Sequence, residues 1–152
     1  MRVCLLCILT LLFHVNSFAS SPFSLEALQG VNVTFLNKNK LLSEAYTASL
    51  QKEVEEKLLK AGIVTSSKSF SNLLFKVQTQ NVKETTLVHI TLSLVENARL
   101  KRLHPIDAIA ITYTKDDLFE TRAMETDVKE SILFLVDELI DQYKEENPPP
   151  KK

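Results

Sequence analysis

The hydrophobic residues of this chain change their spacing twice, and that change constrains the fold more than any other feature. Between residues 43 and 61 they recur every three or four positions, and between 70 and 114 they recur mostly at every second position. From 126 to 145 the helical spacing returns. A spacing of three to four predicts an amphipathic helix, and alternation predicts a half-buried strand. The pattern therefore predicts two long, one-sided helices with a run of strands between them.

The first predicted helix, residues 43–61, has a clear end. Gly62 can adopt the left-handed conformation that commonly closes a helix. The polar face carries two Glu–Lys pairs four residues apart with the acid first, an order that favours ion pairs worth about 0.2–0.5 kcal/mol each. The apolar stripe is Leu50, Val54, Leu58 and Ala61, and the pairs are Glu53 with Lys57 and Glu56 with Lys60.

The predicted strands follow from alternation between turn residues. Asp116 and Asp117 are expected to form a turn, because aspartate bonds readily to its own backbone nearby. Ile109, Ile111 and Tyr113 are expected on one strand face, with small residues on the other. The predicted strands are residues 31–36, 70–79, 85–96, 106–114 and a short one within 119–124, with a short extended stretch at 63–64.

The final helix, predicted from 126 or 127 to 145, ends before the proline run that starts at Pro148. Helices that are apolar on one face only must cover a sheet. The chain is therefore predicted to be α+β: two layers, with a mostly antiparallel sheet of four to five strands and both helices on one face, in the order β-α-β-β-β-α. One domain is expected over 20–147, followed by a disordered tail at 148–152.

The N-terminal stretch has the pattern of a secretory signal peptide. A basic start is followed by an apolar run at 3–13, too short to span a bilayer, and then by small residues up to Ala19. Residues 1–19 are therefore expected to be removed by cleavage after Ala19, leaving no transmembrane anchor. A lipoprotein is not expected, because Leu6 rather than a small residue precedes Cys7.

Composition excludes several functional classes. The chain has only two glycines, so no glycine-rich phosphate loop can be written, and no cofactor is predicted. Both cysteines lie in the expected leader, so the mature domain must be held together by its core rather than by disulfides. A net charge of −1 argues against a nucleic-acid partner.

His89 is the first residue considered for catalysis. It shares a predicted strand face with Thr91 and Ser93, a combination that suggests a hydroxyl nucleophile beside a base. Alternate residues on one strand face lie about 6.6–7 Å apart, beyond hydrogen-bond reach. Polar residues opposite an apolar face are also expected on any half-exposed sheet, so no catalytic residue is predicted.

A second set of residues offers oxygen and nitrogen ligands that could gather around a metal ion. Their spacing matches no recognised ligand motif, so no metal site is predicted. The set is His104, Asp107, Asp116, Asp117 and Glu120.

Two features indicate contact with a partner. Arg99, Lys101 and Arg102 form the one basic cluster, which could meet anionic lipid or polysaccharide, although such a run is commonly a solvated loop. Phe134 lies on the acidic face of the final helix and could mark a contact site. The simpler interpretation is that the N-terminal segment, with Phe23, Leu25 and Leu28, folds over Phe134.

Several core and capping positions resemble a group of short exported bacterial proteins of unassigned function. The layout is also similar to the small α/β domain at the N-terminus of TolB. Because the matching positions are structural, the resemblance implies export and fold but assigns no functional residue. The matching positions are Leu28-x-Gly30-Val31-x-Val33, Val54-Glu55-x-x-Leu58, Lys60-Ala61-Gly62-Ile63 and the run from Tyr143 to Pro148.

The resulting expectation is an exported, non-enzymatic α/β interaction module of a bacterial envelope or secretome, with an unknown envelope or secreted protein as its partner. The chain is expected in the periplasm or outside the cell. Two alternatives remain open. One is a small periplasmic hydrolase or metal-dependent enzyme that uses His89 or His104. The other is a module that binds anionic lipid or polysaccharide through Arg99, Lys101 and Arg102.

Overall fold

The structure is a computed structural model that describes residues 24–36 and 41–149. The predicted signal peptide with its cleavage point at Ala19, residues 37–40 after the first predicted strand and the last residues of the predicted tail lie outside these ranges. Among the helices of the described part, none is long and apolar enough to cross a membrane.

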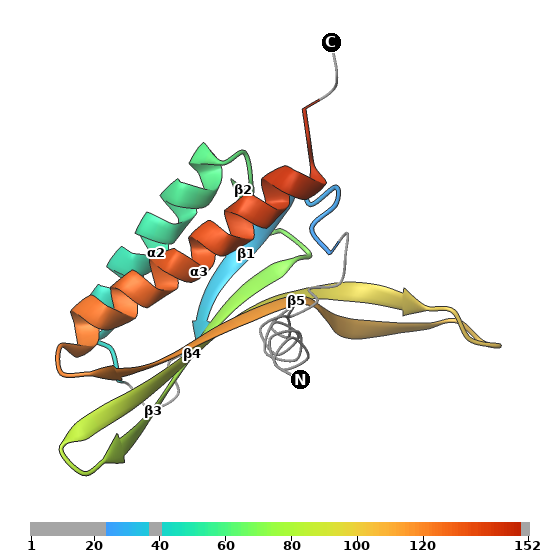
Figure 1. The fold of residues 1–152 in the computed structure, drawn as a ribbon. Helices are drawn as coiled ribbons and strands as arrows, with labels where there is room; N and C mark the ends of the chain where they lie inside the picture. Colours follow the sequence, from blue (N-terminus) through green and yellow to red (C-terminus); the bar gives the residue numbers. More distant parts are fainter. Residues whose placement is uncertain (1–23, 37–40, 150–152) are drawn as a thin grey trace, which may run out of the picture.

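The fold is α+β and its two layers are those that the hydrophobic spacing predicts (Figure 1). A mixed five-stranded sheet forms one layer, and two helices lie side by side on one face of it. The elements in chain order are β1 (Gly30–Leu36), α2 (Glu44–Lys60), β2 (Val64–Thr65), β3 (Asn72–Val82), β4 (Thr85–Leu100), β5 (Ile106–Thr121) and α3 (Met124–Glu146).

The strand order in the sheet is β2-β1-β3-β4-β5. β1 pairs in parallel with both β2 and β3, while the two longest ladders, β3–β4 and β4–β5, are antiparallel. The parallel approach of β1 and β2 explains why residue 30 is glycine. A Cβ at Gly30 would lie 2.7 Å from the Val64 carbonyl oxygen, so any side chain would push β2 away.

The core lies between the sheet and the helices. Leu50, Val54 and Leu58 of α2 are buried, as the helical stripe predicts. On the sheet, alternate residues of β4 point into the same core. The buried sheet residues include Val31, Val33, Leu73, Phe75, Val88, Ile90, Leu92 and Leu94, and α3 contributes Val128, Ile132, Leu135, Val136 and Leu139.

The helix termini follow local capping chemistry. The Ser43 hydroxyl accepts a hydrogen bond from the Tyr46 backbone N–H at 3.1 Å and so begins α2. Gly62 takes a φ of +91° just after α2 ends, the left-handed conformation expected of it. α3 begins two residues earlier than predicted, and two acidic residues in its first turn, Glu125 and Asp127, suit the positive end of the helix dipole.

The ion pairs of α2 differ from the prediction. Within the described part, Lys57 pairs with Asp137 at 2.8 Å and Glu53 with Lys129 at 2.7 Å, so both contacts join α2 to α3. Glu56 pairs with Lys52, one turn earlier in α2, at 3.9 Å rather than with Lys60. The predicted Glu53–Lys57 pair is wrong because α3 brings opposite charges into the groove between the helices. The sequence of one helix alone contains no sign of that neighbour.

Asp116 and Asp117 do not form a turn; they lie inside β5, which runs unbroken from Ile106 to Thr121. The predicted short strand within 119–124 is the end of the same strand. The Asp117 carboxylate accepts a hydrogen bond from the Ser131 hydroxyl of α3 at 2.8 Å. This contact compensates for placing an aspartate in a strand, where its intrinsic preference is poor.

The N-terminal segment packs against the end of α3. The Leu25 backbone N–H donates to the Glu146 carboxylate at 2.6 Å, and the Asn147 side chain both accepts from the Ala27 N–H and donates to the Leu25 carbonyl, each at 2.9 Å. We call these contacts between residues 25–27 and residues 146–147 the clasp, and Leu25 and Leu28 are buried beneath it. The clasp closes the described domain at the point where its first and last segments meet.

Candidate functional site

The β4–β5 hairpin extends beyond the body of the molecule as a two-stranded arm, which we define as residues 97–111 (Figure 1). The strand portion of the arm spans about 13–17 Å, at roughly 3.4 Å per residue. No residue from 95 to 112 is buried. Both helices lie over the other part of the sheet, so the arm has no helix layer above it.

The arm is unusually rich in exposed apolar side chains. Ten large hydrophobic residues are exposed in the described part of the chain, and four of them belong to these 15 residues. Leu103 at the tip is 94% exposed and Ile109 is 77% exposed, values that a core strand would not show. The other two are Ile106 and Ile111. Several exposed apolar residues gathered on one element are typical of an interaction surface.

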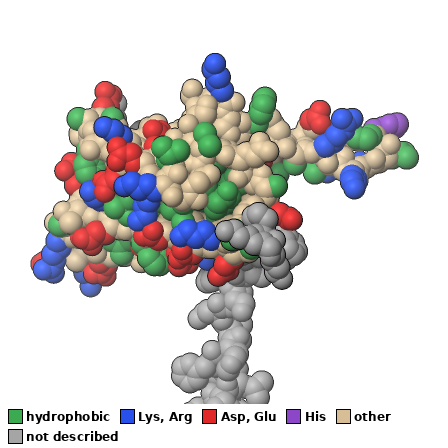
Figure 2. Space-filling model, turned by 90° about the horizontal axis from the view of Figure 1, so that it is seen from above, with side chains coloured by type: hydrophobic (Ala, Val, Ile, Leu, Met, Phe, Trp, Pro, Cys, Tyr) green, Lys and Arg blue, Asp and Glu red, His purple; other side chains and the backbone are tan. Residues whose placement is uncertain are grey.

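The charge of the arm differs in sign from that of the rest of the chain. The arm holds three of the 18 basic residues, namely Arg99, Lys101 and Arg102, and one of the 19 acidic residues, Asp107. It therefore carries +2 while the remainder of the chain carries −3. Figure 2 shows basic, hydrophobic and histidine side chains together at the far end of the arm. All residues from 101 to 107 are exposed.

A β-bulge marks the root of the arm. Leu94 pairs with Tyr113 but Val95 pairs with Ile111, so Thr112 is an extra residue on β5. Because paired residues point to the same face of a sheet, the bulge changes which residues of β5 face the helices. Tyr113 points into the core, whereas Ile111 points to the open face. The predicted single face of Ile109, Ile111 and Tyr113 is therefore wrong.

Glu96 fixes the bulge. Its carboxylate accepts hydrogen bonds from the Thr112 hydroxyl and from the hydroxyl of Ser71, the residue just before β3, each at 2.6 Å. Hydrogen bonds to a charged acceptor are shorter and stronger than neutral ones. Three strands thus meet at one carboxylate, and the direction in which the arm leaves the body depends on it.

The body half of β5 has the charged edge that natural sheets use against unwanted pairing. Lys115 forms an ion pair with Glu138 of α3 at 3.6 Å, and Asp117 is held by Ser131. The arm half of the same strand reads Ile-Asp-Ala-Ile-Ala-Ile from residue 106. It has one charged residue in six and no lysine, so its edge is unprotected.

His89 lies on the open face of the sheet, as predicted, and its Nε2 atom is 3.4 Å from the Asp116 carboxylate. Ser93, also on this face, makes its contact with Thr114 at 3.3 Å. Within the described residues His89 has no hydroxyl partner. The arrangement is a partly exposed contact between an imidazole and a carboxylate on the open sheet surface.

The candidate metal ligands do not come together. His104 and Asp107 lie at the end of the arm, whereas Asp116, Asp117 and Glu120 belong to the body half of β5. Asp116 and Asp117 also point to opposite faces of the sheet, one to His89 and the other to Ser131. In the described ranges no three histidine, cysteine or acidic side chains group as metal ligands.

Phe134 is 54% exposed and lies at the sheet edge, where α3 passes β5. It lines two shallow grooves, of about 390 and 340 Å³, together with charged residues of β5 and α3. The described part of the N-terminal segment, from residue 24, does not cover Phe134, because it packs at the C-terminal end of α3 on Glu146 and Asn147, about three turns away. Phe23 lies outside the described residues.

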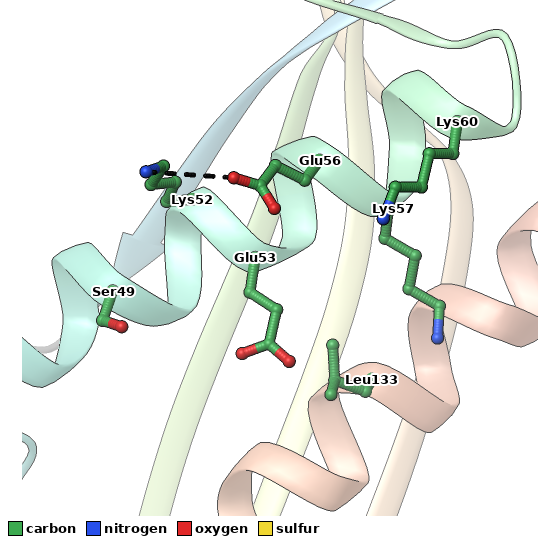
Figure 3. Close-up of a pocket in the computed structure, with 7 residues that line it drawn as sticks. All are labelled: Ser49, Lys52, Glu53, Glu56, Lys57, Lys60 and Leu133. Carbon is green, nitrogen blue, oxygen red and sulfur yellow. Dashed lines mark ion pairs between the residues drawn. The ribbon is translucent and has the colours of Figure 1, made fainter.

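The groove between α2 and α3 is larger, at about 560 Å³, and Figure 3 shows its lining. Five of its side chains are charged residues of α2, three lysines and two glutamates. Glu53 and Lys57 are paired with α3, and Lys52 is paired with Glu56 at 3.9 Å. Such pairing of opposite charges leaves little net field for a charged ligand. The lining residues are Ser49, Lys52, Glu53, Glu56, Lys57, Lys60 and Leu133.

Two tyrosines have raised pKa values. Burial, together with the negative charges of Glu138 and Glu146, raises the pKa of Tyr113, and its hydroxyl is buried without a hydrogen-bond partner in the described residues. Burial, with Glu125 and Glu53, also raises the pKa of Tyr46, whose hydroxyl donates to the Glu125 carbonyl. Both phenols are therefore neutral. Tyr46 joins α2 to the start of α3, and Tyr113 lies in the core.

Sequence reasoning identified the basic cluster but not the arm. A signal was present: the alternating segments 85–96 and 106–114 are joined by a short stretch in which no glycine, serine or aspartate interrupts the chain between Asn97 and Pro105, so the first strand can extend into it. Arg99 and Leu100 end β4 rather than lying in a loop, and Lys101 to Pro105 form the tip.

No family of known proteins and no curated protein matches this sequence. Among solved structures, the chain is similar to a minor lipoprotein from Acinetobacter baumannii, at 13% identity and a TM-score of 0.30, over 76% of this chain and 88% of that one. A likeness at this level carries no argument about function. The similarity to the N-terminal domain of TolB is not confirmed, and the resemblance to short exported proteins stays an expectation.

Proposed function

We propose that this chain is an exported, non-enzymatic interaction module of the bacterial envelope or secretome, and that the β4–β5 arm is the element that contacts its partner. The observation that supports the proposal is the arm itself. Fifteen residues that contribute no buried side chain present four large apolar side chains and three cations to solvent. A sequence gains no folding stability from such exposure, so binding explains it better than packing.

Export is tested by the N-terminus of the product. The predicted leader requires the mature protein to begin at Ser20, which N-terminal sequencing or intact mass measurement of the exported product would detect. A product that retains residues 1–19 would contradict this part of the proposal.

The contact role is tested by site-specific photo-crosslinking in the exporting bacterium. A benzophenone amino acid replaces Ile109 on the arm, and in a matched control it replaces Leu59, an exposed leucine on α2 that is 59% accessible. The proposal expects a defined adduct, to protein or to lipid, from position 109 and none from position 59. Equal labelling at the two positions, or no adduct from 109, would overturn it.

A hydrolase or metal-dependent enzyme remains the alternative from a different class. The His89–Asp116 contact is the observation that favours it. Eleven strand residues separate His89 from the end of β4, so His104 lies roughly 35 Å or more away and cannot act with it. If His89→Ala and His104→Ala together leave the function in the native host unchanged, this alternative is removed.

A further inference from the structure

We infer that the partner of the arm is an anionic membrane surface, with the tip at residues 101–105 seated among lipid headgroups. This inference rests on the proposed function, because it takes the arm as the contacting element and names the chemistry of what it contacts. Each step follows from the placement of the tip residues in the structure.

The first step is shape. Leu103 is 94% exposed at the tip of the arm, between Arg102 and His104. A convex apolar point suits a soft interface that closes around it, whereas a protein partner must supply a matching pocket. Behind the tip, Ile106 is 48% exposed and continues the apolar surface toward the body.

The second step is charge complementarity. Basic residues beside an apolar tip attract anionic headgroups, and each Lys or Arg near such a surface strengthens binding. The remainder of the chain, at −3, is repelled by the same surface. The tip therefore approaches first and the body stays in water. The one acidic residue of the arm, Asp107, lies opposite Arg99 in the ladder rather than at the tip.

A second copy of the chain is a poorer candidate for the partner of the arm than an anionic membrane. Two arms that paired along the free edge of residues 106–111 would join only six residues a side, far from the roughly 1,200–2,000 Å² that a stable interface buries. Two arms of +2 would also repel each other. An anionic polysaccharide matches the cations, but it offers no hydrocarbon to Leu103.

The experiment uses the absence of tryptophan from the sequence. Leu103→Trp in the full chain without its predicted leader supplies the only tryptophan, and vesicles of phosphatidylglycerol with phosphatidylethanolamine supply the surface. The inference expects a blue shift of its emission on these vesicles and none on phosphatidylcholine vesicles. Leu59→Trp on α2 is the matched control and should show no shift with either. A shift at both positions, or at neither, overturns the inference.

The charge requirement is tested by sedimentation with the same vesicles. Arg99→Gln, Lys101→Gln and Arg102→Gln together should weaken binding on the order of a hundredfold. Lys60→Gln, Lys68→Gln and Lys76→Gln remove the same charge from exposed positions on the body and should leave binding unchanged. Added salt should weaken the wild-type binding steeply. Equal losses in the two triple variants would overturn the inference.

Leu103→Ser separates lipid from polysaccharide. It keeps every charge and should weaken vesicle binding about tenfold, because a leucine side chain is no longer transferred from water. Unchanged vesicle binding would overturn the inference. A protein adduct from position 109 with no tryptophan shift on vesicles would also overturn it while leaving the proposed function intact. If position 109 gives no adduct and the tryptophan shows no shift on vesicles, the inference and the proposed function are both overturned.

Discussion

The two halves of the β4–β5 ladder have the same backbone and opposite surroundings. In the body half, Val88, Ile90, Leu92 and Leu94 are buried beneath the helices, and the free edge of β5 carries charges held by α3. In the arm half no side chain is buried and the free edge is apolar. The backbone hydrogen bonds of the ladder are the same in both halves, so they do not distinguish a strand of the core from a strand available for binding. The two differ in whether helices cover their side chains.

The difference also separates stability from function in this chain. Burial of apolar surface supplies most of the stability of a fold, and the arm contributes none of it. Substitutions on the arm should consequently change binding and spare folding, while substitutions in the body half should do the reverse. Four predictions test this division, in order of expected effect.

The largest loss of stability is expected from a change in the buried face of α2, which covers the body half of the sheet. Val54→Asp places an unpaired carboxylate at a site with no solvent exposure and should prevent folding or cost several kcal/mol. Lys52→Asp, two residues earlier on the exposed face of the same helix, should change stability by less than about 0.5 kcal/mol. Equal melting temperatures for the two variants would contradict the assigned helix face.

The second prediction compares the same residue type in the two halves. Ile90→Ala in the body half should lower the free energy of unfolding by about 2–5 kcal/mol, since it leaves a cavity in a fully buried site. Ile109→Ala on the arm should lower it by less than about 0.5 kcal/mol. Urea unfolding of both variants measures the difference, and similar losses would mean that the arm is part of the core.

The third prediction concerns the junction between the halves. Glu96→Ala removes two hydrogen bonds to a charged acceptor and should loosen the arm by about 1–2 kcal/mol, a factor of roughly 5–30 in opening. Hydrogen exchange of amides 97–111 should accelerate by that factor while the amides of β3 beyond its first residues stay protected. Glu56→Ala on α2 is the control. Unaltered exchange in the arm would show that Glu96 does not fix the bulge.

The smallest effect is expected at Tyr113, whose raised pKa means that the fold favours the neutral phenol. Its contribution to stability is complete below about pH 10 and declines as pH rises further, because the unfolded chain then ionises while the folded chain does not. Tyr113→Phe should remove that decline and cost little at neutral pH. Identical pH dependence in thermal unfolding of the two proteins would contradict the buried position.

The helices, their buried faces and the two-layer arrangement could be predicted from the sequence, because the periodicity of apolar residues reports directly on which face is covered. Val54 and Leu58 on α2 illustrate this: both are fully buried. The clasp could not be predicted, since Leu25 and Asn147 are 122 residues apart and their contact depends on how the whole domain closes.

The arm was missed for a different physical reason. Alternation predicts that one strand face is apolar, but it does not say whether anything covers that face. A single extra residue, Thr112, then moves Ile109 and Ile111 to the sheet face opposite Tyr113. Asp116 and Asp117 were misread as a turn because the partners that make them tolerable in a strand, His89 and Ser131, lie on other elements.

The clasp has a topological consequence. Residues 25 and 147 are already in hydrogen-bond contact, so a short linker could join the two ends and new termini could be opened elsewhere without stretching the chain. An opening in the exposed 83–84 turn, between β3 and β4, would produce a circular permutant in which β1 and α3 are sequence neighbours. Such a rewired molecule would still present its arm at the same angle, because the new ends lie at the opposite end of β4 from Glu96 and leave its bonds to Thr112 and Ser71 intact.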